Sequence, residues 1–319
     1  MNLINPESLQ QAYLDACEAE LQAFKPGNVS IHSAGHGMSV EDFRQSAKAS
    51  APPLCDPALS LGEKILHAIA ATRNAVGCNT NLGIVLLAAP LMEACLNVDG
   101  SGSVETCDSP HPGPLPEGEG VSCRFTSAAL KRTKETPLRE NLRHVLAHTT
   151  REDAAWVYRA IRLAAPGGLG ESAEEDVRSD PTVTLLEAMQ IAEGRDRIAW
   201  QYTNNYRNVF DLAIPRYHRW LNLWGDEQWA TLAVFTGLLL AFPDSHIERK
   251  FGDRCTRRVV NRMTLVEQAI AVSGRPEQAM RIIRKVDAEF KSAGINPGTT
   301  ADLTVACLLA VRLDRLFEG

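Results

Sequence analysis

The feature that most constrains this chain is the helical spacing of its apolar residues, which recurs from one end of the sequence to the other. Leu61, Ile65 and Ile69 show the pattern, in which apolar side chains fall on one face of a helix. No segment shows the apolar–polar alternation and tight turn that are typical of β-hairpins. We therefore predict an all-α protein, a single globular domain over residues 1–319 with about a dozen helices.

Proline and capping residues predict where individual helices begin and bend. Thr299 and Asp302 have the spacing of a capping box, in which two side chains hydrogen-bond the first turn of a helix. Pro90 lies inside the apolar segment 82–96. Because a proline removes one helical hydrogen bond, it predicts a kink or a break there.

Residues 100–124 interrupt the helical pattern. The stretch from Gly100 to Gly120 is rich in glycine and proline and poor in apolar residues. Such a stretch cannot bury enough surface to offset the entropy lost on ordering. Its SPHPGPLPEGEG sequence also resembles a translated interspersed repeat of bacterial genomes. We therefore interpret 100–124 as a flexible insertion loop at a tolerant site.

Charge and composition exclude several classes of protein. The formal net charge is -6, whereas a nucleic-acid-binding protein usually presents a basic face. The start of the chain carries acidic residues and no apolar stretch of a signal peptide, and the longest apolar run, Leu232–Phe242, is too short to span a bilayer. The eight cysteines include no CxxC pair, so no zinc or redox motif is indicated. We expect a cytoplasmic protein that binds neither nucleic acid nor a membrane; a homo-oligomer is left open.

Four polar turns, each at a helix end, could carry chemistry. In the first, Gly27 can adopt a positive φ that lets backbone N–H groups converge on an anion, and Asn28 follows it. Lys25 adds a positive charge suited to a phosphate. The alternative is a simple helix stop, because a lysine there complements the helix dipole.

The second turn precedes the apolar segment 82–96. Asn79, Thr80 and Asn81 crowd the start of a helix, where backbone N–H groups and a partial positive charge already favour anions. Gly83 would let another backbone approach closely. Capping alone needs only one polar residue, so both a structural and a functional interpretation stay open.

The third turn combines acids with a guanidinium. Asp244 and Glu248 could hold Mg²⁺, which prefers a few carboxylates together with phosphate oxygens and water. Arg249 could bind a phosphate through two hydrogen bonds. The alternative is a solvated charged turn.

The fourth turn again leads from a glycine into a helix. Gly298 and Thr299 offer backbone and hydroxyl donors, and Asp302 follows in the first turns. A capping box between Thr299 and Asp302 would explain both residues without any function.

Taken together, these segments resemble the triphosphoribosyl-dephospho-CoA synthase family over the range Leu21–Leu309. The matching elements are Lys25–Asn28, Phe43 with Ser46 and Ala47, Asn79–Gly83, Asp244 with Arg249 and Gly252, and Pro297–Leu303. The chain looks like a divergent branch, similar to copies in methylotrophs and methanogens, because the His-x-Asp-Met element of the family is Gly35-His36-Gly37-Met38 here and lacks the aspartate.

The resemblance implies a reaction. The triphosphoribosyl group of ATP would move to the ribose 2′-hydroxyl of 3′-dephospho-CoA, with release of adenine. Such a reaction builds oxocarbenium character on the ribose, as glycoside hydrolysis does, and needs a carboxylate, a base and cations for the triphosphate. Two alternatives stay open: a related transferase with another acceptor in pterin or furan cofactor biosynthesis, and a helical protein that binds a nucleotide without catalysis.

The resemblance and the four turns together define the residues that we expect to line one cleft. The expected catalytic residues are Asp302 and Asp244, and the expected Mg²⁺ ligands are Asp244 and Glu248. The residues expected to bind the nucleotide and its phosphates are Lys25, Gly27, Asn28, Asn79, Thr80, Asn81, Gly83, Arg249, Gly298 and Thr299.

Overall fold

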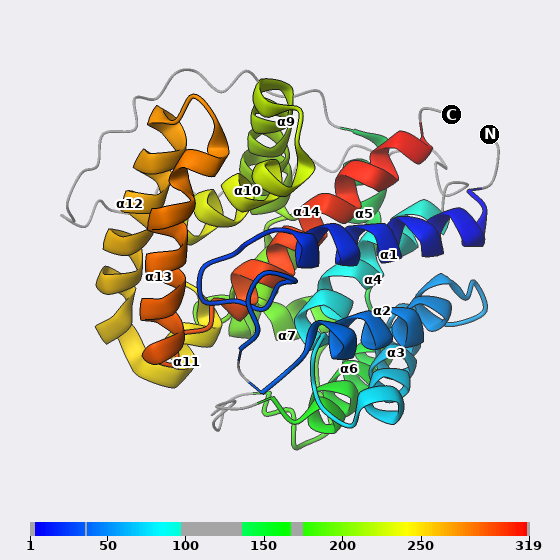
Figure 1. The fold of residues 1–319 in the computed structure, drawn as a ribbon. Coiled ribbons are helices and arrows are strands. Elements are labelled where there is room, and N and C mark those ends of the chain that lie inside the picture. The colour runs from blue at the N-terminus through cyan, green and yellow to red at the C-terminus, as the bar shows by residue number, and fades with distance from the viewer. Residues whose placement is uncertain (1–3, 36, 97–135, 167–174, 318–319) are drawn as a thin grey trace, which may run out of the picture.

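The computed structural model describes residues 4–35, 37–96, 136–166 and 175–317 (Figure 1). In these ranges the regular elements are helices, which confirms the predicted fold class. The predicted insertion loop at 100–124 and His36 lie outside the described residues. The α-helices are α1 (Pro6–Gln22), α2 (Val40–Cys55), α3 (Leu61–Val76), α4 (Leu82–Leu96), α5 (Pro137–Ala147), α6 (Arg151–Ala164), α7 (Leu185–Ala192), α8 (Arg197–Thr203), α9 (Ile214–Trp224), α10 (Glu227–Ala241), α11 (Ser245–Phe251), α12 (Thr256–Val272), α13 (Met280–Ser292) and α14 (Gly298–Leu316). A π-helical turn η1 (Asn208–Ala213) and two 3₁₀ turns, η2 (Gly252–Cys255) and η3 (Pro276–Ala279), join some of them.

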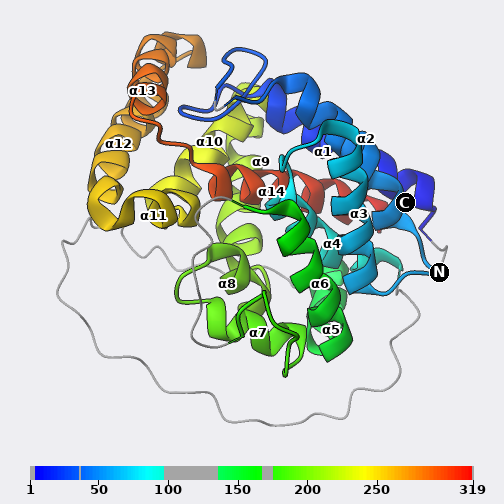
Figure 2. The ribbon, with the colours of Figure 1, turned by 90° about the horizontal axis from the view of Figure 1, so that it is seen from below.

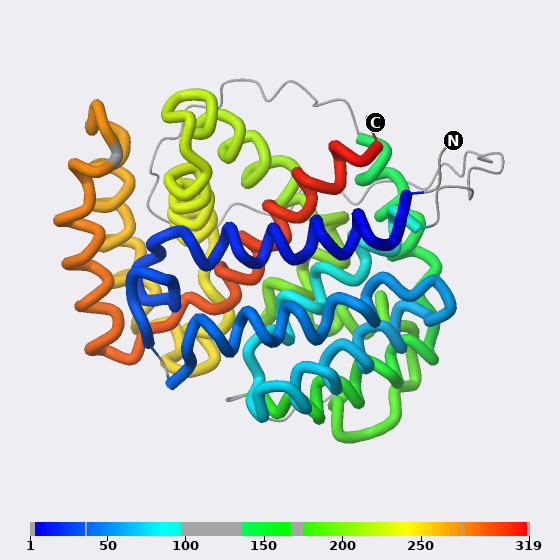
Figure 3. Tube along the Cα trace, turned by 45° about the vertical axis from the view of Figure 1, so that its right-hand side comes forward, coloured from blue at the N-terminus to red at the C-terminus, as the bar shows by residue number. Residues whose placement is uncertain are grey.

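Helix α14 runs through the middle of the molecule and is packed on most sides. It lies against α1, α4 and α10 (Figures 1 and 3). Helices α2, α3 and α6 cover one side, and α12 and α13 form a pair on the other, as the view from below also shows (Figure 2). A central helix must be apolar on nearly all faces, and the buried residues of α4, α10 and α14 meet that condition.

The central helix α4 continues through Pro90, so the predicted break is wrong. A proline at position 90 leaves the carbonyl of Leu86 without its helical N–H partner. The buried hydroxyl of Tyr202 donates to that carbonyl at 2.6 Å, and the hydroxyl of Tyr206 donates to the carbonyl of Leu87 at 3.1 Å. Side chains from α8 and the turn after it therefore replace the missing hydrogen bond.

We find no single helix in the described ranges that is both long and apolar enough to cross a membrane. By length and composition only, one bent pair, Glu227–Ala241 with Ser245–Val272, meets the same criteria.

Candidate functional site

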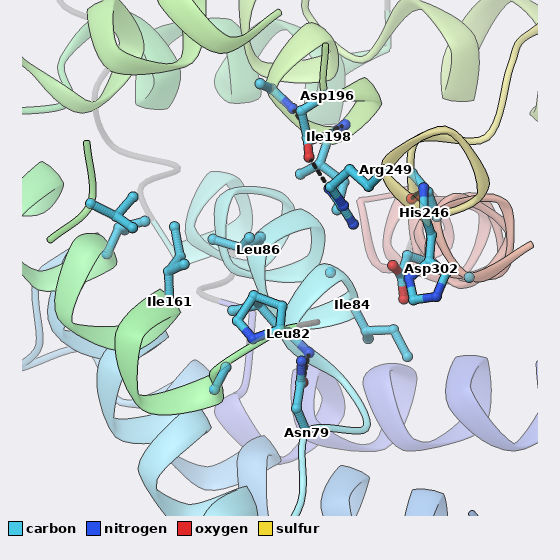
Figure 4. A pocket seen from close by; sticks show the side chains of 18 of the residues that line it. Asn79, Leu82, Ile84, Leu86, Ile161, Asp196, Ile198, His246, Arg249 and Asp302 are labelled. Carbon is cyan, nitrogen blue, oxygen red and sulfur yellow. Dashed lines mark hydrogen bonds and ion pairs between the residues drawn. The ribbon is translucent and has the colours of Figure 1, made fainter. Parts of the chain in front are cut away.

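A cleft of about 680 Å³ opens where α4, α6, α7, α8, α11 and α14 approach one another. Its polar wall includes Glu20, Asn79, Asp196, His246, Arg249 and Asp302. Its apolar wall includes Leu82, Leu86, Val157, Ile161, Leu185 and Ile198. Figure 4 shows His246, Arg249 and Asp302 close together, with Leu86 and Ile161 away from them. The cleft therefore has a charged end and an apolar end, as suits a ligand that carries both kinds of group.

Asp302 projects from the start of α14 into this cleft, and the packing against α4 depends on a glycine. A Cβ atom added at Gly83 would lie 2.0 Å from Oδ2 of Asp302. No residue in the described ranges gives Asp302 a hydrogen bond or an ion pair, so its carboxyl group is available to a ligand. Burial raises the pKa of Asp302 well above its usual range, and the nearby Asp244 and Glu20 raise it further. The protonated form is therefore favoured more in Asp302 than in an exposed aspartate.

Asp244 does not line the cleft but fixes two helix starts at once. Its Oδ1 atom accepts hydrogen bonds from the backbone N–H groups of His246 and Ile247 at 2.9 and 3.1 Å, which caps α11. Its Oδ2 atom accepts from the N–H and the hydroxyl of Thr300 at 2.8 and 2.7 Å, near the start of α14. The buried Asp244 thus joins α11 to α14 and aligns the two helices that carry Arg249 and Asp302.

The predicted capping box between Thr299 and Asp302 is wrong. Helix α14 begins at Gly298 with Pro297 as its N-cap, and no side chain of its own sequence caps it. The hydroxyl of Thr299 instead accepts a hydrogen bond from the N–H of His246 at 3.2 Å. Because the cap of α14 comes from Asp244, Asp302 is free of any capping role.

Asp244→Ala should lower the free energy of unfolding by about 3–5 kcal/mol, because it removes a buried acceptor from both helix starts. Asp226→Ala is the matched control, since Asp226 caps only α10 through the N–H of Trp229. That control should cost about 1 kcal/mol. Urea unfolding of both variants measures the difference, and equal losses would show that the link from Asp244 to α14 adds no stability.

Arg249 is oriented by an aspartate that the sequence analysis did not select. Oδ1 of Asp196 caps α8 by accepting hydrogen bonds from the N–H groups of Ile198 and Ala199. Its Oδ2 atom accepts from Nη1 of Arg249 at 2.7 Å (Figure 4). In the sequence, Asp196 stands immediately before a helix, as a capping residue does. The pair holds the guanidinium at the charged end of the cleft.

The asparagine-threonine turn before α4 divides between the cleft and the core. Asn79 lines the cleft and its Oδ1 atom accepts from the N–H of Leu82 at 3.2 Å, which caps α4. Thr80 also lines the cleft and donates to Ser46. Asn81 is buried and does not line the cleft. It lines a separate small cavity of about 10 Å³ instead.

Lys25 and Gly27 are not in the cleft wall. The Lys25 side chain is fully buried, and its ammonium donates to the backbone carbonyl groups of Glu20, Ala23 and Val29. Gly27 has a φ of 81°, as its position predicts, but its N–H donates to Asp287 at 2.9 Å. A phosphate would therefore have to displace interactions that the fold already makes.

The structure thus gathers part of the expected set. The residues of that set that line the cleft are Asn28, Asn79, Thr80, Gly83, Arg249, Gly298, Thr299 and Asp302. Those that do not line it are Lys25, Gly27, Asn81, Asp244 and Glu248. Packing also brings Glu20, Asp196 and the apolar wall into the cleft, although no motif selected them. His246 lines the cleft too; it lies in the third turn, between Asp244 and Arg249, but was not among the expected residues.

The residues expected to bind Mg²⁺ do not fit a metal site. Both oxygens of Asp244 are occupied by backbone and hydroxyl donors, and Glu248 lies outside the cleft wall. The described residues also contain no group of three or more His, Cys, Asp or Glu side chains that could hold a metal ion. Magnesium therefore stays a prediction without assigned ligands.

Comparison with known proteins identifies the family. The family described as ATP:dephospho-CoA triphosphoribosyl transferase matches residues 6–319. No curated protein sequence matches the chain. A solved structure from Archaeoglobus fulgidus, provisionally described as a triphosphoribosyl-dephospho-CoA synthase, superposes with a TM-score of 0.55 at 21% identity, and the match covers 83% of this chain and 96% of that one. At that identity the solved structure shows the fold alone, whereas the family match extends over nearly the whole sequence. The chain belongs to the ATP:dephospho-CoA triphosphoribosyl transferase family.

Proposed function

We propose that this protein transfers the triphosphoribosyl group of ATP to the ribose 2′-hydroxyl of 3′-dephospho-CoA and releases adenine. The observation that carries the proposal is the Asp302 carboxyl group, which faces the cleft without a hydrogen-bond partner among the described residues. The Arg249 guanidinium lies near this carboxyl group at the charged end of the cleft, and apolar side chains line the other end. The family match over residues 6–319 supports the same reaction.

The properties of the cleft agree with the needs of this chemistry. As the bond from ribose C1′ to adenine breaks, positive charge develops on the ribose and negative charge on the base. Burial of Asp302 favours its protonated form, and a protonated carboxyl group facing the cleft can give its proton to the departing base. Arg249 can bind a phosphate, and the apolar wall can accommodate the flat base.

The direct test is an assay for free adenine. Purified protein would be incubated with ATP, magnesium and dephospho-CoA, and the coupled product would be detected by mass spectrometry. We expect adenine and the coupled product in equal amounts. Adenine release only with a pterin or furan acceptor would favour the alternative transferase. ATP binding with no adenine release under any of these conditions would favour a non-catalytic protein.

Arg249→Ala should weaken ATP binding by roughly 10- to 100-fold, because a hydrogen bond to a charged group contributes about 1.5–3 kcal/mol. The turnover number should fall less than the affinity, since a guanidinium contacts phosphate in the ground and transition states alike. Isothermal titration with ATP measures the effect. Arg254→Ala is the control, because Arg254 is exposed and outside the cleft wall; equal losses in both variants would exclude a local phosphate contact.

We propose that residues 1–319 form one domain, that the protein acts in the cytoplasm, and that it can form a homo-oligomer. Size-exclusion chromatography with light scattering and limited proteolysis would test the first and the last of these.

A further inference from the structure

A second carboxylate, Glu20, borders the cleft, and no sequence motif pointed to it. Glu20 lies near the end of α1 and is only 5% exposed. The small cavity that Asn81 lines also touches Glu20. Because Glu20 is among the lining residues of the cleft, a ligand there can contact this side chain.

Lys25 places a positive charge directly against Glu20. The two side chains form an ion pair, with 3.1 Å between Nζ of Lys25 and Oε1 of Glu20. The backbone carbonyl groups of Glu20, Ala23 and Val29 fix the ammonium at 2.6, 3.2 and 3.2 Å. Burial raises the pKa of Glu20, and the Lys25 ammonium opposes that rise. Lys25, which the sequence suggested as a phosphate ligand, instead supplies the counter-charge of a cleft carboxylate.

The other acids of the cleft are held by neighbouring donors. Asp196 accepts from Arg249 and from the start of α8. Glu175 accepts from Thr182 and from Tyr158. Asp302 has no such donor among the described residues, and Glu20 has only the Lys25 ammonium. These two carboxyl groups differ in one respect that matters for acid–base chemistry: only Glu20 has a cation in contact.

We propose that Glu20, which lines the cleft and forms an ion pair with Lys25, is a second catalytic residue of this site, and that it acts as the base while Asp302 acts as the acid. In this scheme the oxygen of the acceptor hydroxyl forms a bond to ribose C1′, and the bond from C1′ to the base breaks with its electron pair moving to the base nitrogen. Asp302 gives its proton to the departing base, and Glu20 takes the proton of the hydroxyl. Glu20 also stabilises the positive charge on the ribose before the new bond is complete. The proposal rests on the transfer reaction proposed above.

Glu20→Gln keeps the shape of the side chain and removes its charge. We expect the turnover number for adenine release to fall by about 100-fold or more, while the affinity for ATP changes by less than about threefold. Glu18→Gln is the matched control on the same helix, because Glu18 pairs with Arg44 at 2.6 Å and lies outside the cleft wall. The control should keep the parental turnover.

Lys25→Met gives a signature that a purely structural ion pair would not give. Without the ammonium, burial raises the pKa of Glu20 further. Since the reaction needs the Glu20 anion, which is lost as the pH falls, the acid limb of the pH–rate profile should move to higher pH by about one unit or more. An unmoved acid limb in a folded Lys25→Met variant would overturn the proposal.

The double variant Glu20→Gln with Lys25→Met separates catalysis from folding. Replacing both members of a buried ion pair often preserves stability, so this variant should melt near the parental temperature even where a single variant does not fold. We expect it to stay at least about 100-fold less active than the parent. If it recovers parental turnover, the pair is structural and the proposal fails. If the parent protein itself releases no adenine, the proposed reaction fails instead, so the two failures are distinguishable.

Discussion

Asp302→Asn should reduce the turnover number by about 1,000-fold while leaving ATP affinity within about threefold of the parent. An asparagine has nearly the same shape and can still fill the space against Gly83, where a Cβ would lie 2.0 Å from Oδ2 of Asp302. It cannot give a proton to the leaving base. Adenine release under saturating substrates and isothermal titration with ATP measure the two quantities.

The stability of this variant distinguishes catalysis from capping. Asp302 does not cap α14, so its replacement removes no capping hydrogen bond and only a poorly solvated carboxyl group. The melting temperature of Asp302→Asn at neutral pH should therefore stay equal to the parental one or rise. A capping role would lower the free energy of unfolding by about 0.5–1 kcal/mol and leave turnover intact. Parental turnover in Asp302→Asn would exclude the proposed role and leave Glu20 as the leading cleft acid.

The pH dependence follows from the raised pKa of Asp302, whose first cause is burial. A group with a raised folded-state pKa is protonated below that value and loses its proton as the pH rises through it. A step that needs protonated Asp302 should therefore slow on the alkaline side, above the ordinary range of an aspartate. The free energy of unfolding should fall as the pH rises from the ordinary pKa of an aspartate to the raised pKa of Asp302, because over that range the unfolded chain has lost the proton and the folded protein still holds it. The alkaline limb should be absent from the residual activity of Asp302→Asn.

Gly83→Ala should abolish most of the activity, by about 100-fold or more, although it adds a single methyl group. The added Cβ would lie 2.0 Å from Oδ2 and 2.5 Å from Cγ of Asp302, and 2.9 Å from Cδ1 of Ile198. The Asp302 side chain would have to leave its position, because its Oδ2 and Cγ atoms lie closer to the added Cβ than non-bonded atoms can approach. Adenine release measured beside ATP affinity would show the loss as a fall in turnover.

Gly194→Ala is the matched control for this substitution. Nothing lies within 4 Å of a Cβ added at Gly194, which also lies in the turn before α8. Its turnover should stay within about twofold of the parent. The double variant Gly83→Ala with Asp302→Ala should recover the melting temperature lost by Gly83→Ala, yet stay inactive. If Gly83→Ala alone is fully active, the close contact with Asp302 has no catalytic consequence.

The sequence by itself determined the helical class and most of the local helix starts. Ser39 with Asp42 and Thr150 with Asp153 form the capping boxes that their spacing predicts. Asn79 caps α4 as a polar residue before an apolar helix should. These features depend on donors and acceptors within three residues of one another, so the chain carries them wherever it folds. The family resemblance, which rested on short motifs in order, was likewise confirmed by the family match over residues 6–319.

The tertiary structure alone decided what each polar residue does. Asp244 caps α14 from 56 residues away, which is why the local capping box at Asp302 did not form. The sequence predicts that Lys25 binds a phosphate, because it stands at the end of a helix next to a glycine turn. Packing instead buries Lys25 against Glu20. Whether a charged side chain meets solvent, a ligand or another charge depends on which helices pack against it. The spacing of residues along the chain does not determine this packing. Asp302 and Glu20 lie in one site because α1 packs against α14.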